Sequence, residues 1–214
     1  FKLHCLSLWS GRRGGGKSVA VANLMKIAKD KGYFDVVKLI SPTYWSNKEI
    51  WDIAGIQESD TFEPDRMCLK EIDKVVEKER LDWEQHLLML KRWEEFQSDR
   101  SNDLGCCDAD RLLDYYDFGF LDKNQKPQWK YKHDGPGRCA VIIDDAVGTD
   151  LYSKPSAGLL NFAVKHRHIQ KGTGISIFML VQTYSCSGGG VPRAIRENCT
   201  YLCLFKLKDE SQLE

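Results

Sequence analysis

Hydrophobic residues along this chain follow two alternating patterns, one typical of buried strands and the other of amphipathic helices. Short apolar runs predict strands at residues 1–8, 36–40, 139–143, 175–181 and 200–207. Apolar positions three and four residues apart predict helices at residues 18–31, 64–96 and 156–168. Because the strands are apolar on both faces and alternate with helices, we expect an α/β fold. Its central sheet should be mainly parallel, with about five strands and helices on both faces.

The segment between the second and third predicted strands differs from the rest. Its long helix at 64–96 has a charged face, and polar stretches with turn-forming residues at 98–105 and 122–137 predict breaks in the chain. The length of 214 residues suits one domain with a core of its own. We therefore expect a single domain over residues 1–214 that contains an acidic helical insertion at about 49–117.

The formal net charge is zero, but the charges are unevenly distributed. Residues 49–117 contain 20 acidic and 9 basic side chains, whereas the rest of the chain contains 11 acidic and 22 basic ones. A basic core suits an anionic partner such as nucleic acid, while the alternative is that the insertion is only a well-solvated helical segment. If nucleic acid binds, we expect the basic core to hold it and the acidic insertion to point away from it.

The eight cysteines lack the spacing of a zinc site or a disulfide framework, because no Cys-x-x-Cys pair occurs. Cys5, Cys139 and Cys203 lie inside apolar runs, where a thiol acts as a small hydrophobic side chain. We expect free thiols in a reducing, intracellular compartment. The longest apolar run, Ile175–Val181, is about a third of the length that crosses a bilayer, so no membrane-spanning helix is expected.

The strongest motif lies between the first predicted strand and the first helix. Residues 11–18, Gly-Arg-Arg-Gly-Gly-Gly-Lys-Ser, match the G-x-x-x-x-G-K-[ST] pattern of a phosphate-binding loop. Glycines let backbone N–H groups surround a phosphate, Lys17 can bridge the β- and γ-phosphates, and Ser18 can hold Mg²⁺. The motif therefore predicts a site for ATP with Mg²⁺. The residues expected to contact the nucleotide are Gly11, Arg13, Gly14, Gly15, Gly16, Lys17, Ser18 and Val19.

Two acids and an amide end the apolar strands that follow. Asp144 and Asp145 come directly after the third predicted strand, and Gln182 comes directly after the fourth. Since parallel strands end at the same edge of a sheet, we expect these side chains beside the phosphate loop. Asp144 is expected to hold the metal together with Ser18. Asp145 is expected to polarise the attacking water, and Gln182 to orient that water or to sense the γ-phosphate.

Three arginines compete for a role in neutralising charge at the site. Arg167 stands between two histidines, just before a glycine-containing turn. A guanidinium supplied to the γ-phosphate of a neighbouring subunit would stabilise the charge that develops during hydrolysis. Arg193 and Arg196 are the competing candidates. Each of the three can instead be a solvated cation at the end of a helix.

Several of these residues occur in a longer series of short motifs. The series consists of Asp144-Asp145, Asn161-Phe162, Arg167-His168, Gln182-Thr183-Tyr184, Arg196 and Asn198, with Leu-Ile-Ser-Pro-Thr-Tyr at 39–44. It resembles the genome-packaging ATPases of poxviruses and other large nucleocytoplasmic DNA viruses, within the FtsK–HerA superfamily. The resemblance covers about 1–45 and 139–207. The segment 49–117 does not align, and His166 stands where family members commonly have Gly.

The resemblance implies an ASCE-type P-loop NTPase with strand order 5-1-4-3-2, so that the strand ending at Gln182 lies between the phosphate-loop strand and the Asp144 strand. It also implies a homo-oligomeric ring, a pentamer or hexamer, with ATP at the subunit interfaces and Arg167 acting between subunits. Double-stranded DNA would pass through the ring and be held by its backbone without sequence preference. Lys154 and Arg193, on loops after the two central strands, are the first candidates for DNA contact.

We therefore expect an ATP-hydrolysing motor that translocates double-stranded viral DNA into the capsid during virion assembly. Capsid or portal-vertex proteins would be its partners, and the host-cell cytoplasm, with its virus factory, and the virion would be its locations. Two alternatives stay open. One is a stand-alone P-loop phosphotransferase on a small molecule, with the insertion as its lid, and the other is a nucleotide-dependent assembly scaffold. Hydrolysis stimulated by duplex DNA would favour the motor, whereas transfer to an acceptor other than water would favour the phosphotransferase.

Overall fold

Contacts within the chain divide it into two units. In the computed structural model, residues 2–102, 104, 107–152, 157–184 and 191–206 are described. One unit consists of Phe1–Glu77 and Gly137–Glu214, and the other of Lys78–Pro136. Residues 49–77 of the acidic segment therefore belong to the first unit, together with the residues of the phosphate loop.

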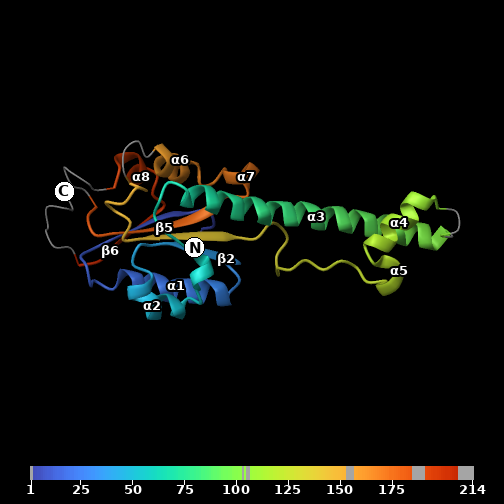
Figure 1. The fold of residues 1–214 in the computed structure, drawn as a ribbon, viewed down its shortest axis with the longest axis horizontal. Coiled ribbons are helices and arrows are strands. Elements are labelled where there is room, and N and C mark those ends of the chain that lie inside the picture. Colours follow the sequence, from blue (N-terminus) through green and yellow to red (C-terminus); the bar gives the residue numbers. More distant parts are fainter. Residues whose placement is uncertain (1, 103, 105–106, 153–156, 185–190, 207–214) are drawn as a thin grey trace. The chain divides into compact units, whose positions relative to one another are not determined.

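The first unit is built on a parallel sheet of six strands (Figure 1). Each strand pairs in parallel with its neighbours, in the order β3-β2-β4-β5-β1-β6. The order of the five longer strands is the predicted one, and the strand before Gln182 lies between the phosphate-loop strand and the Asp144 strand. The strand count differs by β3, which the sequence pattern misses because two residues are too short to show a period. The strands are β1 (Leu6–Ser10), β2 (Val36–Ile40), β3 (Thr61–Phe62), β4 (Cys139–Asp144), β5 (Ile175–Val181) and β6 (Tyr201–Leu204).

Pairing between neighbours explains where the strands begin and end. The predicted bounds of β2 and β5 are confirmed, but β1 begins at Leu6, where its pairing with β5 begins opposite Ile177. The predicted strand at 1–8 is wrong over residues 2–5, because an apolar sequence forms a strand only where a neighbour supplies hydrogen bonds. The segment Phe205–Lys206 leaves β6 but remains bonded to the chain after β1, since Phe205 N–H donates to the Ser10 carbonyl.

Helices cover both faces of this sheet, as the sequence predicts (Figure 1). Alternate residues of β4 supply the two cores, with Val141 and Ile143 in one and Ala140 and Ile142 in the other. The first core also contains residues of α6, α8 and the start of α3, and the second contains residues of α1 and α2. The helices with residues in the first unit are α1 (Lys17–Asp30), α2 (Lys48–Ile53), the start of α3 (Cys68–Asn102), α6 (Ala157–Lys165), α7 (Ile169–Gly172) and α8 (Arg193–Glu197), with short 3-10 turns η1 (Trp45–Asn47) and η2 (Glu58–Asp60).

The second unit contains the rest of α3, together with α4 (Ala109–Asp117) and α5 (Phe120–Lys123). α3 continues to Asn102, so the predicted break at 98–105 is wrong over its first five residues. The helix is stabilised there by tertiary packing, because Phe96 is buried against Tyr115 and Phe120, and the Tyr115 hydroxyl donates to Asp99 at 2.6 Å. The second predicted break is largely confirmed, since residues 124–138 form neither helix nor strand.

The cysteines at 5, 68, 107, 139, 199 and 203 are free thiols. Within the described part of the chain, no cluster of three or more His, Cys, Asp or Glu side chains has the arrangement of a metal site. None of the described helices combines the length and the apolar character that a membrane crossing needs.

His166 is buried at the end of α6 and joins that helix to the start of the sheet. Its side chain is 2% exposed, with one ring nitrogen 2.6 Å from the Ala163 carbonyl oxygen and the other 2.9 Å from the His4 carbonyl oxygen. Burial lowers the pKa of His166, and the charges of Arg167 and His168 lower it further, while the two carbonyl contacts act in the opposite direction. Nearby, burial lowers the pKa of His4, and the charges of His166, Arg138 and Arg167 lower it further.

These pKa shifts predict that protonation of His166 and His4 weakens the fold. A histidine with a lowered pKa binds its proton less well in the folded than in the unfolded chain, so stability falls as pH drops through the ordinary histidine value of about 6.5. We expect the urea midpoint of His166→Gln to respond differently to acid: between pH 7.5 and 5 the stability lost relative to the unaltered protein should shrink, although the variant is less stable at pH 7.5. The exposed His168 provides the comparison, because its charge is a smaller cause of the His166 shift than burial, so His168→Gln should change the slope of the midpoint against pH less than His166→Gln does. An unchanged slope in His166→Gln would rule out His166 as the source.

Candidate active site

The phosphate-loop motif forms the connection between β1 and α1, as the sequence predicts. Gly14 and Gly16 have φ angles of 72° and 86°, which side chains with a Cβ rarely adopt. Gly11 is required for a different reason, because a Cβ there would lie 2.5 Å from Cβ of Phe205. The Gly11 N–H donates to the Val181 carbonyl at 3.2 Å, which ties the start of the loop to the end of β5. The loop is therefore held between two strands and opens at the N-terminus of α1.

Lys17 is folded into this loop. Its ammonium group donates to the Gly11 carbonyl at 2.6 Å and to the Arg12 carbonyl at 3.1 Å, and the residue is 8% exposed. Burial lowers the pKa of Lys17, whereas the carboxylates of Asp144 and Asp145 raise it. An anionic ligand in the loop would add negative charge beside this buried ammonium group and would favour its charged form, as the two carboxylates do.

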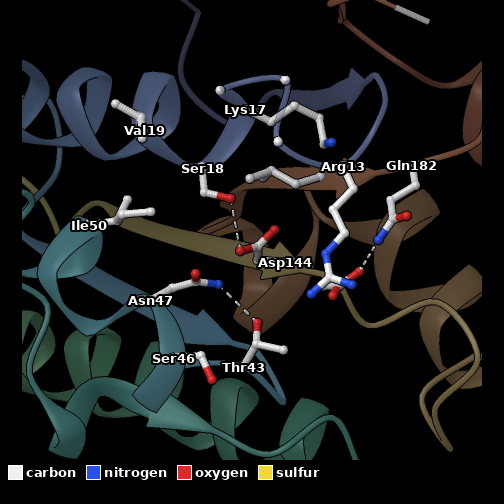
Figure 2. Close-up of a pocket in the computed structure, with 15 residues that line it drawn as sticks. Arg13, Lys17, Ser18, Val19, Thr43, Ser46, Asn47, Ile50, Asp144 and Gln182 are labelled. Atoms are coloured by element: carbon white, nitrogen blue, oxygen red, sulfur yellow. Dashed lines mark hydrogen bonds between the residues drawn. The ribbon is translucent and has the colours of Figure 1, made fainter. Parts of the chain in front are cut away.

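Ser18 and Asp144 meet across the site. The Ser18 hydroxyl donates to Oδ2 of Asp144 at 3.1 Å, and Asp144 is 4% exposed at the end of β4 (Figure 2). The pKa of Asp144 is raised to about 6, mainly by burial and also by the charge of Asp145, while the Ser18 hydrogen bond and the charge of Lys17 act in the opposite direction. A hydroxyl and a buried carboxylate are oxygen ligands of the kind that Mg²⁺ prefers. The pair expected from the sequence to hold Mg²⁺ is therefore brought together with a chemistry that fits the ion.

Asp145 and Gln182 form a second pair at the same edge of the sheet. Gln182 Nε2 donates to Oδ1 of Asp145 at 2.7 Å, and the strands before them are neighbours, with Asp144 opposite Leu180. Asp145 has a φ angle of 52°, in the left-handed region that Asp and Asn tolerate better than most side chains. The turn directs the two successive acids to different partners, Asp144 to Ser18 and Asp145 to Gln182.

These groups line one cavity of about 420 Å³. Of the residues expected to contact nucleotide, those from Arg13 to Val19 line this cavity, while Gly11 lies behind it at the base of the loop. Sequence reasoning missed one wall of the cavity. It is formed by Thr43, Ser46, Asn47 and Ile50, which follow β2. The signal was available, since β2 is a parallel strand and the chain after it must reach the same edge as Asp144 and Gln182.

The arginine candidates lie away from the cavity. Arg167 is exposed, and its guanidinium donates to the Thr200 hydroxyl at 3.4 Å. The N–H of Thr200 donates to the Leu6 carbonyl at the beginning of β1, so Arg167 belongs to the amino edge of the sheet, opposite the phosphate loop. It does not line the cavity of its own chain, so the two predicted roles that agree with its position are action on another subunit and a solvated cation at the end of a helix.

The two other arginines have local partners. Arg193 pairs with Glu197 at 2.6 Å on α8, and the guanidinium carbon of Arg196 lies 5.1 Å from the centre of the Tyr184 ring. Neither lines the cavity. Lys154, the other candidate for DNA contact, lies outside the described residues.

Comparison with known proteins identifies the fold. No protein-family model matches the chain, and no curated protein matches it. Among solved structures, EssC (ATPases 2 and 3) from Geobacillus thermodenitrificans is 13% identical with a TM-score of 0.52, over 98% of this chain and 33% of that one. The cytoplasmic domain of EssC is 14% identical with a TM-score of 0.49, over 98% of this chain and 34% of that one. The pCW3 conjugation coupling protein TcpA is 16% identical with a TM-score of 0.43, over 99% and 51%.

The chain spans about a third of the length of the EssC structures that it resembles. At this level of identity the likeness concerns the fold alone. The described chain has the fold of a P-loop ATPase domain.

Proposed function

We propose that this protein is an Mg²⁺-dependent ATPase that moves double-stranded DNA, as the genome-packaging motor of a large DNA virus. The ATPase part of the proposal rests on one observation. Five side chains with the chemistry of a nucleotide site line the same cavity: Lys17, Ser18, Asp144, Asp145 and Gln182. These residues come from distant parts of the sequence, and each has the chemistry that its place in a nucleotide site requires.

The residues divide the work of hydrolysis between them. The N–H groups of the glycine loop and of the start of α1 bind phosphate oxygens, and Lys17 neutralises charge between the β- and γ-phosphates. Ser18 and Asp144 would hold Mg²⁺, which supplies positive charge to the phosphates when bound. Asp145 orients and polarises the attacking water, and Gln182 holds the Asp145 carboxylate by donating to Oδ1.

The DNA part of the proposal rests on charge and on the resemblance of residues 1–45 and 139–207 to packaging ATPases. Outside residues 49–117 the chain has twice as many basic as acidic side chains, 22 against 11, which favours binding to a polyanion. The proposal includes a ring of five or six subunits, capsid or portal-vertex proteins as partners, and action in the host-cell cytoplasm and the virion. The position of Arg167 at the amino edge supports a role between subunits, because the guanidinium lies at the opposite edge from the site of its own chain.

ATP hydrolysis by the purified protein, with and without duplex DNA, tests this function. We expect stimulation by DNA of any sequence, falling steeply between about 50 and 200 mM salt because phosphate contacts release counterions. Lys17→Ala should abolish hydrolysis with and without DNA. An equal rate of ATP hydrolysis with and without DNA would contradict the motor function. Phosphate transfer to an acceptor other than water would indicate the phosphotransferase.

The role of Asp145 can be separated from nucleotide binding. Asp145→Asn keeps the shape of the side chain and tolerates the positive φ angle, but it removes the charge that polarises water. We expect nearly unchanged affinity for Mg²⁺–ATP and a fall of kcat by about 100- to 10,000-fold. The exposed Asp30 at the end of α1 provides a matched control, and Asp30→Asn should leave kcat unchanged. A variant that fails only to bind would contradict the catalytic role.

Mixing experiments test whether Arg167 acts between subunits. Arg167→Ala and Lys17→Ala should each be inactive alone, because one lacks the arginine and the other lacks a working phosphate loop. A mixture should recover part of the hydrolysis, since an intact loop can then stand beside an intact Arg167. Lys165→Ala, an exposed change at the end of α6, should remain active by itself. Absence of recovery in mixed assemblies would contradict action between subunits.

A further inference from the structure

The chain after β2 forms a polar wall of the cavity. The residues of this wall have no role in the hydrolysis described above. Thr43, Ser46 and Asn47 face the same space as Ser18 and Asp144. Figure 2 shows Asp144 between Ser18 and Lys17 on one side and these three residues on the other. The wall has hydroxyl and amide groups and no ionised side chain, so it can donate hydrogen bonds to an anion without adding charge.

Hydrogen bonds hold the wall in a defined arrangement. Asn47 Nδ2 donates to the Thr43 hydroxyl at 3.2 Å, and the Thr43 hydroxyl lies 3.2 Å from Oγ of Ser41. Ser41 is fully buried and also accepts from the Thr43 N–H at 3.2 Å. The Asn47 amide therefore has one hydrogen committed to Thr43, while its second hydrogen is free of that bond.

Packing fixes the wall to the rest of the sheet. Tyr44 is 4% exposed, Trp51 of α2 is fully buried, and both belong to the core that contains α1. The side chains that line the cavity thus alternate with side chains that anchor the segment. A wall mounted in this way presents its polar groups at fixed positions, as a binding site must.

The order of the strands indicates which part of a nucleotide would reach this wall. β2 lies beside β4, on the side away from β5 and β1. The phosphate loop follows β1, and the Ser18–Asp144 pair lies between that loop and the wall. A polyphosphate that enters at the loop and passes the Ser18–Asp144 pair presents its terminal phosphate to the wall.

We propose that Asn47, positioned by Thr43, binds the terminal phosphate and makes the site selective for a nucleoside triphosphate over the diphosphate. The inference rests on the proposed ATPase function and deepens it. Asp145, held by Gln182, then polarises the attacking water from the β5 side of the cavity, while Asn47 binds the γ-phosphate from the β2 side. Loss of the terminal phosphate on hydrolysis removes the Asn47 contact. The hydrogen bond of Asn47 is therefore made with a triphosphate and absent with a diphosphate.

Binding measurements with Mg²⁺ and either a non-hydrolysable ATP analogue or ADP test this proposal. Asn47→Ala should weaken binding of the analogue by about 10- to 100-fold, the effect of one hydrogen bond to a charged group, and leave ADP affinity unchanged. Asn47→Asp should weaken binding of the analogue further, since it places a negative charge against the phosphate. Thr43→Val should weaken binding of the analogue less than Asn47→Ala does. Thr43→Ser, which keeps the hydroxyl, should bind the analogue as the unaltered protein does.

A matched amide provides the control. Asn23 on α1 donates to the Val19 carbonyl at 2.8 Å and does not line the cavity, so Asn23→Ala should bind both ligands normally. Equal losses for the analogue and ADP in Asn47→Ala, or no loss for either, would overturn the inference. These outcomes are distinct from failure of the proposed function, because in that case the unaltered protein itself would not bind the analogue or hydrolyse ATP.

Discussion

The site depends on the parallel pairing of β5 with its two neighbours. β5 is buried along its whole length, and its register places Val181 opposite Ser10 of β1 and Leu180 opposite Asp144 of β4. These pairings bring the ends of three strands to one edge, where the loop after β1, the acids after β4 and the amide after β5 meet. A shift of β4 by one residue would turn the Asp144 side chain to the other face of the sheet and away from Ser18.

Charge is held at this edge at some cost to the isolated fold. Burial favours the neutral forms of both Lys17 and Asp144, since it lowers the pKa of one and raises the pKa of the other. Lys17 has only backbone carbonyls as hydrogen-bond partners, and Asp144 has the Ser18 hydroxyl. Each group lies in the field of the other, and a nucleotide with its cation would add further opposite charge to both. The same burial that destabilises these charges therefore favours ligand binding.

The two edges of the sheet carry different chemistry. The carboxyl edge holds the phosphate loop, the acids and the wall after β2, whereas the amino edge holds Arg167 beside Thr200 and the buried contact of His166 with His4. If Arg167 serves the site of another subunit, the amino edge of one copy must face the carboxyl edge of the next. Such a head-to-tail contact is heterologous, and it closes into a ring when the rotation between copies allows.

Local patterns in the sequence were sufficient to predict β2, β5, the phosphate loop and the acids after β4, because each depends on residues that are neighbours in the chain. The continuation of α3 through polar residues to Asn102 and the burial of His166 between two carbonyls depend on contacts with distant segments. The wall of Thr43 and Asn47 was missed although it directly follows a predicted parallel strand, because its residues match no phosphate-binding motif. The sequence alone determined which chemical groups end each strand, since periodicity and motif spacing are local properties. Only the tertiary structure decided which of those groups meet, because strand register and packing bring together residues more than a hundred positions apart.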